Sequence, residues 1–446
     1  MSPVVATIAT SICIRGVAAP PSAVIVKTLL LSAVLLTCLA SGHLPAATYF
    51  VAQPAQGAFS IVAPDGSETK PWSTIPYALS RILGGDTLYV KSGIYQGVGV
   101  IIPASLSGTA ANPTRIQAWP GDSVILCGDG PYAGQVKLAA CSNLVLAGFI
   151  ITNFSQGFAL EAATDVTILN CAIQHVGLEG IAIRGNSRQV LVQGCSITHA
   201  GSGSDHAAAI SIGSGLAGPL DNTSLITLRS NVIGNLVGSA VELQPGTHDC
   251  TVERNTISAV AAGRNRAAIE VHEATLGVQQ WAANPNHVVN GNLLHDTGTA
   301  IRAGTGCRVV NNLIYNLTPG GSGILVDNPA GDTYPRQIYQ NTIDAPATLA
   351  VSVSAGLADI RNNLGPSQTN NLPVTAAYFV NAVAHNYHLA PRSPPVDAGV
   401  DLSAIVPDDL EGTHRPHGKG VDLGAYERVP ARPAPPGGLR IIHTGP

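Results

Sequence analysis

The sequence predicts an all-β protein built as a parallel β-helix, a solenoid of short stacked strands. The first observation is that one short sequence motif recurs about nine times between Asn143 and Asn363, most clearly as Cys250 to Ile257. The copies are anchored on the residue two before their Ile or Leu, namely Gly148, Cys171, Cys195, Asn231, Asn255, Asn292, Asn312, Asn341 and Asn363. The anchors are mostly separated by twenty-odd residues, with a few longer intervals, which is typical of a solenoid with inserted loops.

The second observation is that aliphatic residues recur at two positions around the anchor. An Ile or Leu lies two residues after it in the first eight copies, and a Val, Ile or Leu lies three residues before it in all nine. This alternation, rich in β-branched residues, indicates strands. Second strands lie between anchors, as in 181–184, 241–244, 269–272 and 301–304. Coils of several short strands, stacked at about 4.8 Å, form a β-helix with an aliphatic core.

The anchor column itself predicts structure rather than ligand binding. It begins with small residues, including Cys171 and Cys195, and is Asn from Asn231 onward. Buried Asn side chains that bond up and down a stack form a structural ladder. The chain has eight Cys but no Cys/His spacing typical of zinc, so we predict no metal site of that kind.

The amino-terminal segment, residues 1–47, is predicted to be a signal peptide. Lys27 precedes an apolar run that ends at Ala40, and Pro45 to Ala47 offers a cleavage site. A further hypothesis places the true start at Val26, on a non-ATG codon. The apolar run is too short for a stable membrane span, so we expect a secreted or periplasmic protein. Six Cys would remain after cleavage, and the sequence leaves their pairing open.

The rest of the chain divides into four predicted segments. Residues 48–140 form an N-terminal cap and the first coils, 141–365 the repeats, 366–428 a closing segment and 429–446 a Pro/Gly-rich tail. In the cap, Ser73 or Thr74 can begin a short helix with Pro76 in its first turn, and Gly84 can end it. Residues 87–90 are the first full strand. The helix is expected to cover the open end of the solenoid.

Three further stretches carry a resemblance to a known group. They are Pro71 to Tyr95, Asn112 to Gly121, and the closing phrases between Asn386 and Glu427. Together they resemble the entry, next coil and closing segment of secreted right-handed parallel β-helix proteins of the pectate-lyase-like superfamily. The resemblance covers nearly all of residues 48–428 and implies a right-handed helix. It implies little about activity, because that superfamily includes lyases, hydrolases, epimerases, esterases and non-enzymatic surface proteins.

Two outward-facing columns on the second strands carry the candidate site. The residues between and after the inward aliphatics point outward. One column reads Ala182, Ser211, Glu242, Glu270, Arg302, Leu325 and Ser352. The next column reads Arg184, Gly213, Gln244, His272, Gly304, Asp327 and Ser354. Charge collects in the middle coils, which favours a site over a merely solvated face.

The two longest repeats place loops beside this charged patch. One loop contains Asp205 and His206, and the other contains Arg264 and Arg266 before the strand and Trp281 after it. Long loops on a rigid scaffold are where function usually lies, so we expect them to wall a groove. Trp281 can stack on a sugar face or anchor its loop.

The candidate side chains support more than one chemistry. Glu242 and Glu270 lie on neighbouring coils, so their carboxylates can approach to about 5 Å, as in a retaining glycosidase. The same pair can hold Ca²⁺. His272 can act as acid or base, and Arg302, Arg184, Arg264 and Arg266 can bind uronate carboxylates. The alternative is a salt-bridged ladder of Glu270 and Arg302 that keeps the sheet soluble.

These observations lead to one functional hypothesis and two rivals. We expect an extracellular, monomeric, carbohydrate-active protein that cleaves an acidic polysaccharide by β-elimination, with Glu242, Glu270, His272 and Arg302 as catalytic candidates and Arg184, Asp205, His206, Gln244, Arg264, Arg266 and Trp281 as substrate-binding candidates. The chain has no Lys between Lys137 and Lys419, which excludes a Lys base on the central coils unless Lys137 reaches them. The rivals are a glycoside hydrolase that uses the Glu pair and a non-catalytic glycan-binding or structural surface protein. A net charge of −4 argues against nucleic acid as a partner.

Overall fold

The structure is a computed structural model, and it describes residues 46–54, 63–97, 99–202, 207–214, 221–260, 266–272, 275–276, 279–280, 285–327 and 334–429. The predicted signal peptide lies almost entirely outside these residues. Residues Thr48–Pro446 form one compact unit. Among the described residues, no helix combines the length and apolar character needed to cross a bilayer.

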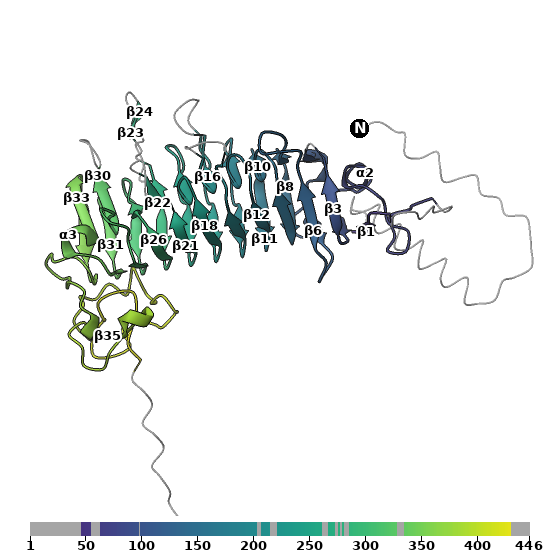
Figure 1. The fold of residues 1–446 in the computed structure, drawn as a ribbon. Helices are drawn as coiled ribbons and strands as arrows, with labels where there is room; N and C mark the ends of the chain where they lie inside the picture. The colour runs from purple at the N-terminus through teal and green to yellow at the C-terminus, as the bar shows by residue number, and fades with distance from the viewer. Residues whose placement is uncertain are drawn as a thin grey trace, which may run out of the picture. The chain divides into compact units, whose positions relative to one another are not determined.

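Three long parallel sheets make up the body of this unit, as predicted (Figure 1). The first sheet consists of β1 (Thr48–Val51), β2 (Thr87–Val90), β5 (Thr114–Ala118), β8 (Ser142–Ala147), β11 (Thr164–Leu169), β14 (Leu191–Gln193), β17 (Thr227–Arg229), β20 (Thr251–Glu253), β25 (Val288–Asn290), β28 (Arg308–Val310), β31 (Arg336–Tyr339) and β34 (Ala358–Arg361). The second sheet consists of β4 (Val100–Ile102), β7 (Val136–Ala139), β10 (Phe158–Glu161), β13 (Ile181–Arg184), β16 (Ile210–Ile212), β19 (Val241–Leu243), β22 (Ala267–Val271), β27 (Thr299–Arg302), β30 (Ile324–Asp327) and β33 (Val351–Ala355). The third sheet consists of β3 (Gly93–Gln96), β6 (Val124–Cys127), β9 (Phe149–Thr152), β12 (Ala172–Gln174), β15 (Ser196–Thr198), β18 (Val232–Leu236), β21 (Thr256–Val260), β26 (Leu293–Thr297), β29 (Leu313–Tyr315) and β32 (Thr342–Ile343).

Each coil visits the first, third and second sheets in turn, and the aliphatic residues of all three meet in one core. Strand-to-strand pairing is parallel and in register, so that Val192, Leu228 and Val252 form one inward column, and each is fully buried. Stacking places like residues against like residues. The core of the β-helix is therefore one continuous, mainly aliphatic cluster, and two smaller clusters pack the closing segment against the last coils.

The sequence alignment of the first repeat was wrong by one residue. Cys171 stacks on Phe149 rather than on Gly148, because Ala172 pairs with Ile150 and Ile173 with Ile151. The inward residue of that coil is Ile151, and Ile150 faces outward. Gly148 instead occupies the preceding turn position, where the chain adopts a left-handed conformation with φ of 78°. Later coils place Asn170 and Arg254 at this position, with φ of 49° and 54°.

The predicted asparagine ladder is present. The backbone N–H and the side-chain Nδ2 of Asn255 both donate to Oδ1 of Asn292, at 3.0 and 2.9 Å. The same pattern links successive members from Asn231 to Asn363, and it continues to Asn371, which the sequence analysis did not include. Cys195 joins the ladder through its backbone N–H, which donates to Asn231. The ladder therefore satisfies buried backbone groups at one corner of the helix.

The amino-terminal end is covered by the predicted short helix, α2 (Ile75–Leu79). The hydroxyl of Thr74 accepts a hydrogen bond from the N–H of Tyr77 at 3.4 Å, and Pro76 lies in the first turn. The helix ends at Leu79, earlier than the predicted stop at Gly84. Ile75, Ala78 and Leu79 are buried against the first coils. The helix therefore shields the aliphatic cross-section that the solenoid would otherwise expose.

Beyond the last coil the chain is mostly irregular. Its described residues contain the antiparallel pair β35 (Phe379–Asn381) and β36 (Asn386–Leu389) and the short 3₁₀ helices η3 (Ala376–Tyr378) and η4 (Ala382–Ala384). Within the coils, the 3₁₀ helix η1 (Ala104–Leu106) lies between β4 and β5, and α3 (Ala347–Ala350) directly precedes β33. A second antiparallel pair, β23 (Thr275–Leu276) and β24 (Gln279–Gln280), belongs to the loop after β22.

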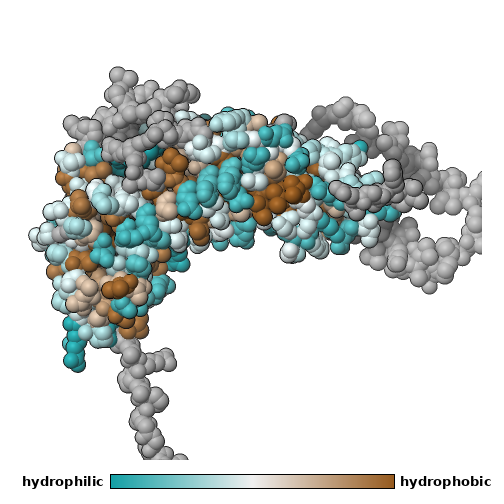
Figure 2. Space-filling view, viewed as in Figure 1, coloured by the Kyte–Doolittle hydropathy of each residue, from teal (hydrophilic) through white to brown (hydrophobic). Residues whose placement is uncertain are grey.

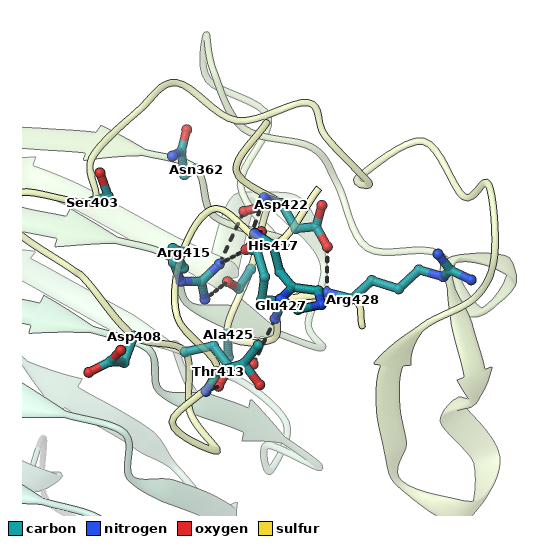
Figure 3. A network of polar contacts seen from close by, with 12 residues as sticks. Asn362, Ser403, Asp408, Thr413, Arg415, His417, Asp422, Ala425, Glu427 and Arg428 are labelled. Carbon is teal, nitrogen blue, oxygen red and sulfur yellow. Dashed lines mark hydrogen bonds and ion pairs between the residues drawn. The ribbon is translucent and has the colours of Figure 1, made fainter. Parts of the chain in front are cut away.

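A buried arginine fastens this closing segment to the coils (Figure 3). Arg415 is 1% exposed and donates from Nη1 to Glu427 Oε2 at 2.7 Å. Its Nη2 donates to the carbonyl of Gly424 at 2.9 Å and to Oδ1 of Asn311, a turn residue of the β-helix, at 3.2 Å. A guanidinium that is paired and hydrogen-bonded in this way fixes geometry, because leaving either charge alone would be costly.

Candidate functional site

Three neighbouring strands of the second sheet, β19, β22 and β27, carry the charged patch. Glu242 pairs with Glu270, and Glu270 pairs with Arg302, each at the same position of its strand. The residues on either side of Glu270, Ile269 and Val271, are buried in the core. Because side chains alternate along a strand, the three charged residues point away from the core.

The register extends this outward column along the whole sheet. It reads Ile101, Lys137, Ala159, Ala182, Ser211, Glu242, Glu270, Arg302, Leu325 and Ser352. The column is thus the one derived from the sequence, with charge concentrated in the three central coils. On the face seen in Figure 2, hydrophilic and hydrophobic residues alternate in patches along the molecule.

Glu242 is the most enclosed acid of the patch, with 3% of its surface exposed. Its Oε1 forms an ion pair with Nη1 of Arg266, and its Oε2 accepts a hydrogen bond from Nε2 of Gln244 at 2.8 Å. Burial raises the pKa of Glu242 above its usual value; Arg266 opposes this effect and the nearby charge of Glu270 adds to it. Glu242 therefore holds a proton to higher pH than an exposed glutamate.

Glu270 pairs with a different arginine from Glu242. It is 4% exposed, accepts a hydrogen bond from the hydroxyl of Ser239 at 3.2 Å and forms an ion pair with Nε of Arg302 at 3.5 Å. Nη1 of Arg302 lies 3.4 Å from Oδ2 of Asp327 on β30. Arg302 thus bridges two acids, as expected for the Glu270–Arg302 ladder. The ion pairing by itself is compatible with either a structural or a functional role.

His272 follows directly after β22, one position beyond the end of the strand. Its backbone N–H donates to the carbonyl of Leu243 at 2.9 Å. Its side-chain Nε2 is buried and has no hydrogen-bond partner among the residues that the structure describes. Burial lowers the pKa of His272, with Arg266 and Arg302 adding to the shift and Glu270 opposing it. The imidazole is therefore neutral at neutral pH.

The donor atoms of Glu242, Glu270 and His272 lie within 4.8 Å of one another, so these three residues could hold a divalent cation. Their surroundings do not suit Ca²⁺. That ion takes six to eight oxygen ligands, whereas both carboxylates here already pair with guanidinium groups. A cation would have to displace Arg266 and Arg302, and their positive charges would repel it. The described residues of the cluster therefore do not fit a resident Ca²⁺.

The structure brings together six of the predicted site residues: Glu242, Gln244, Arg266, Glu270, His272 and Arg302. Arg184 lies apart from them, on β13 three coils before β22, where it forms an ion pair with Glu179. At about 4.8 Å per coil, that separation is roughly 14 Å. Asp205, His206, Arg264 and Trp281 lie outside the described residues.

Sequence reasoning missed the role of two neighbours. Ser239 precedes β19, outside the alternation that identified the columns, yet its hydroxyl contacts Glu270. Asp327 was placed in the second column but was not assigned to the site, although it shares Arg302 with Glu270. Pairing between Asp327 and Arg302 was detectable in principle, because the two residues lie on adjacent strands.

Comparison with known proteins identifies the fold. The family model described as right handed beta helix region matches residues 123–216. The solved structure of pectate lyase Pel9A aligns with a TM-score of 0.60 at 17% identity, covering 87% of this chain and 98% of that one. The alginate lyase from Paenibacillus sp. str. FPU-7 aligns with a TM-score of 0.51 at 16% identity, covering 67% and 96%.

A complex of XylC with xylose aligns with a TM-score of 0.53 at 10% identity, covering 86% of this chain and 98% of that one. No curated protein matches the sequence. Identities this low establish the architecture alone. Activity has to be argued from the residues of the site.

Proposed function

We propose that this right-handed parallel β-helix protein, which has the fold of the pectate-lyase-like superfamily, cleaves an acidic polysaccharide by β-elimination at the Glu242–Glu270–His272 cluster. The observation that carries the proposal is the buried Nε2 of His272, which has no hydrogen-bond partner in the described part of the chain and lies beside two carboxylates and two guanidinium groups. A neutral imidazole in such a setting is a suitable base for a carbon acid. The solenoid supplies a rigid platform on which a polymer can lie.

The environments of His272 and Glu242 suit opposite roles in that reaction. The pKa of His272 is lowered, which keeps its imidazole unprotonated near neutral pH, and the pKa of Glu242 is raised above that of an exposed glutamate, which favours its protonated form. Pairs of groups whose pKa values are pushed apart are the usual basis for assigning base and acid. We assign His272 as the general base and Glu242 as the general acid.

The proposed step moves one proton from the substrate to His272 and a second from Glu242 to the leaving group. Nε2 of His272 removes the proton on C5 of a uronate residue, and the electron pair of that bond forms a C4=C5 double bond. The C4–O bond to the next sugar breaks, and its oxygen takes the proton held by Glu242. Arg266 and Arg302 provide the N–H groups that neutralise the uronate carboxylate and so acidify C5–H. To do so they share those groups with Glu242 and Glu270.

A second candidate, glycoside hydrolysis, is favoured by one specific observation. Glu242 and Glu270 are paired carboxylates whose donor atoms lie within 4.8 Å together with His272, close to the roughly 5 Å separation of retaining glycosidases. Glu242 would again be the acid, and Glu270, paired with Arg302, would be the nucleophile. In that reaction water adds across the cleaved bond and no double bond forms.

The products separate these candidates. Purified protein is incubated with a panel of uronate polysaccharides while ultraviolet absorbance and reducing ends are both followed. Reducing ends that appear together with the unsaturated chromophore support β-elimination. Reducing ends without the chromophore support hydrolysis and reject the proposed reaction. Neither signal on any polymer, with polymer binding retained, indicates a non-catalytic glycan-binding protein.

The substrate class also bears on where the protein works. Acidic polysaccharides of this kind lie outside the cytoplasm, and the basic and apolar pattern of residues 27–40 supports export. We therefore propose that the protein acts in the periplasm or outside the cell. Fractionation followed by amino-terminal sequencing of the mature protein tests this, and a mature chain that begins at Met1 would contradict it.

A further inference from the structure

A pocket of about 210 Å³ lies on a different sheet from the candidate site, between the first sheet and the closing segment. Its floor is formed by residues at the ends of β20, β25 and β28, and its wall by the chain from Ile405 to Leu410. A hydrogen bond from Nδ2 of Asn311 to the carbonyl of Asp408, at 2.8 Å, holds floor and wall together. The cluster described above, on the second sheet, contributes nothing to it.

Two arginines line this pocket with uncommitted N–H groups. Arg254 is exposed at a left-handed turn position, and its side chain has no hydrogen-bond or ion-pair partner among the described residues. Arg308 begins β28, and its Nε donates to Oε1 of Gln337 at 2.9 Å. Its terminal nitrogens have no partner in the described part of the chain. Guanidinium N–H groups of this kind suit a carboxylate.

The acids nearby do not neutralise these arginines. The carboxylate of Asp409 accepts hydrogen bonds from three backbone N–H groups, those of Glu411 at 2.9 Å, Thr413 at 2.7 Å and Glu427 at 2.8 Å. Asp408 is exposed at the rim, and its Oδ1 lies 3.1 Å from Nδ1 of His414. The pocket thus offers two cationic groups and, at its edge, one carboxylate able to accept hydroxyl donors.

The remaining lining suits the body of a sugar. Val288, Val310, Ile405 and Leu410 present aliphatic surface, and Asn290 presents an amide. Apolar walls with a few converging polar groups are typical of small-molecule sites. The volume lies below that of pockets for drug-sized ligands, which favours a single ring over an oligosaccharide. Because groups that can accept hydrogen bonds from sugar hydroxyls lie beside the arginines, the pocket suits an acidic sugar better than a simple anion.

We propose that this pocket, framed by Arg254, Arg308 and Asp408, binds one carboxylate-bearing sugar residue, at a site separate from the cleavage site. The choice of a uronate as the ligand rests on the proposed function. The presence of the pocket and of its charged groups does not depend on that function. A second binding site on another sheet would hold the polymer, or a released acidic sugar, while the Glu242 cluster acts on a different residue.

The test is a calorimetric or NMR titration of the full-length protein with sodium D-galacturonate and sodium D-glucuronate. The neutral parent sugars and sodium acetate serve as ligand controls, and a uronate polymer forms a second arm. Arg254→Ala and Arg308→Ala should each weaken binding by about tenfold, the loss expected for a charge-assisted hydrogen bond. Arg229→Ala is the matched control, since Arg229 lies on the same sheet in an ion pair with Glu253.

Retained affinity in Arg229→Ala and in His272→Gln, with loss in the two pocket variants, supports the site. Binding of the monosaccharides then identifies the ligand as a free sugar, and binding of the polymer identifies it as a residue of a polysaccharide chain. Equal binding of the neutral sugars, or full affinity in both pocket variants, would overturn it. A loss in His272→Gln equal to that in the pocket variants would place the binding at the Glu242 cluster instead. Cleavage that continues without pocket binding rejects this inference alone, and binding without cleavage rejects only the proposed reaction.

Discussion

Glu242 and Glu270 occupy the same outward position on adjacent strands of one sheet, and each is almost fully buried. Each carboxylate pairs with its own arginine, Arg266 or Arg302, and His272 lies against both. Burial and like charge raise the free energy of the ionised pair, whereas the two arginines lower it. The balance is unfavourable at Glu242, whose pKa is raised. Residues held in such an unfavourable state are commonly functional.

Glu242→Gln should remove activity without lowering stability. A glutamate whose pKa is raised on folding binds its proton more tightly in the folded state, so its contribution to stability is greatest below pH 4.5 and is lost as the pH rises through the folded pKa. Gln has nearly the same shape and no charge, so it avoids the free-energy cost of burying an ionised carboxylate at neutral pH. We expect a melting temperature at least equal to that of the wild type at neutral pH, and a fall in cleavage rate of about 100-fold or more.

Glu253→Gln is the control for that variant, because Glu253 pairs with Arg229 on another sheet. It should keep the wild-type rate. A Glu242→Gln protein that cleaves normally, or that melts well below the wild type at neutral pH, would show that Glu242 is only part of a stabilising salt-bridge network.

The acidic limb of the pH–rate profile should lie below pH 6.5. The pKa of His272 is lowered by burial and by the neighbouring arginines, so the neutral base persists to lower pH than an exposed histidine allows. His272→Gln should lose about 100-fold or more in kcat/KM and should also lose this limb. The control is His199→Gln, since His199 is exposed and stacks on His175. An unchanged acidic limb in His272→Gln would assign the base elsewhere.

Chelation should leave activity intact. The carboxylates of the cluster are paired with guanidinium groups and cannot supply the oxygen ligands that Ca²⁺ requires. Rates measured with EDTA, and again after excess Ca²⁺ is added, should therefore match the untreated rate. If EDTA abolishes cleavage and Ca²⁺ restores it, the arginines must move aside in the working enzyme, and the assignment of Arg266 and Arg302 to the substrate carboxylate would fail.

Asn292→Ala should destabilise the fold strongly without touching the site. Asn292 is fully buried; its Oδ1 accepts two hydrogen bonds from Asn255, and its Nδ2 donates to the carbonyl of Val252 at 2.8 Å. Removing the side chain leaves several buried polar groups unpaired, at a cost of about 3 kcal/mol or more. Urea denaturation measures this, with Asn222→Ala as the exposed control. Equal stability in both variants would remove the structural role of the ladder.

The fold was predictable because each coil of a solenoid repeats the same pattern of inward-facing residues in the sequence. Val252 and its counterparts recur at one position, so no single copy had to be interpreted alone. The Asn ladder was visible for the same reason. The error at Gly148 arose where the repeat is least regular, since a glycine in a left-handed turn and the residue after it both fitted the pattern.

The candidate site was only partly predictable. Alternation along a strand placed Glu242, Glu270 and Arg302 in one outward column, because pairing in a parallel sheet is fixed by the repeat. The repeat pattern did not predict how deeply these side chains are buried or which residues they pair with. That Arg266 reaches Glu242, and that Ser239 reaches Glu270, depends on segments outside the regular strands. The pocket at Arg254 depends on a closing segment more than a hundred residues further along the chain.

The most direct test of the central claim is the ultraviolet absorbance of the unsaturated uronate, recorded while the mature protein and its His272→Gln variant act on the same uronate polymers. We expect the absorbance to rise steadily with the wild type on at least one polymer, and to rise at least about 100-fold more slowly with the variant, at an equal melting temperature. No rise on any uronate polymer, or equal rises from both proteins, would contradict β-elimination at this cluster.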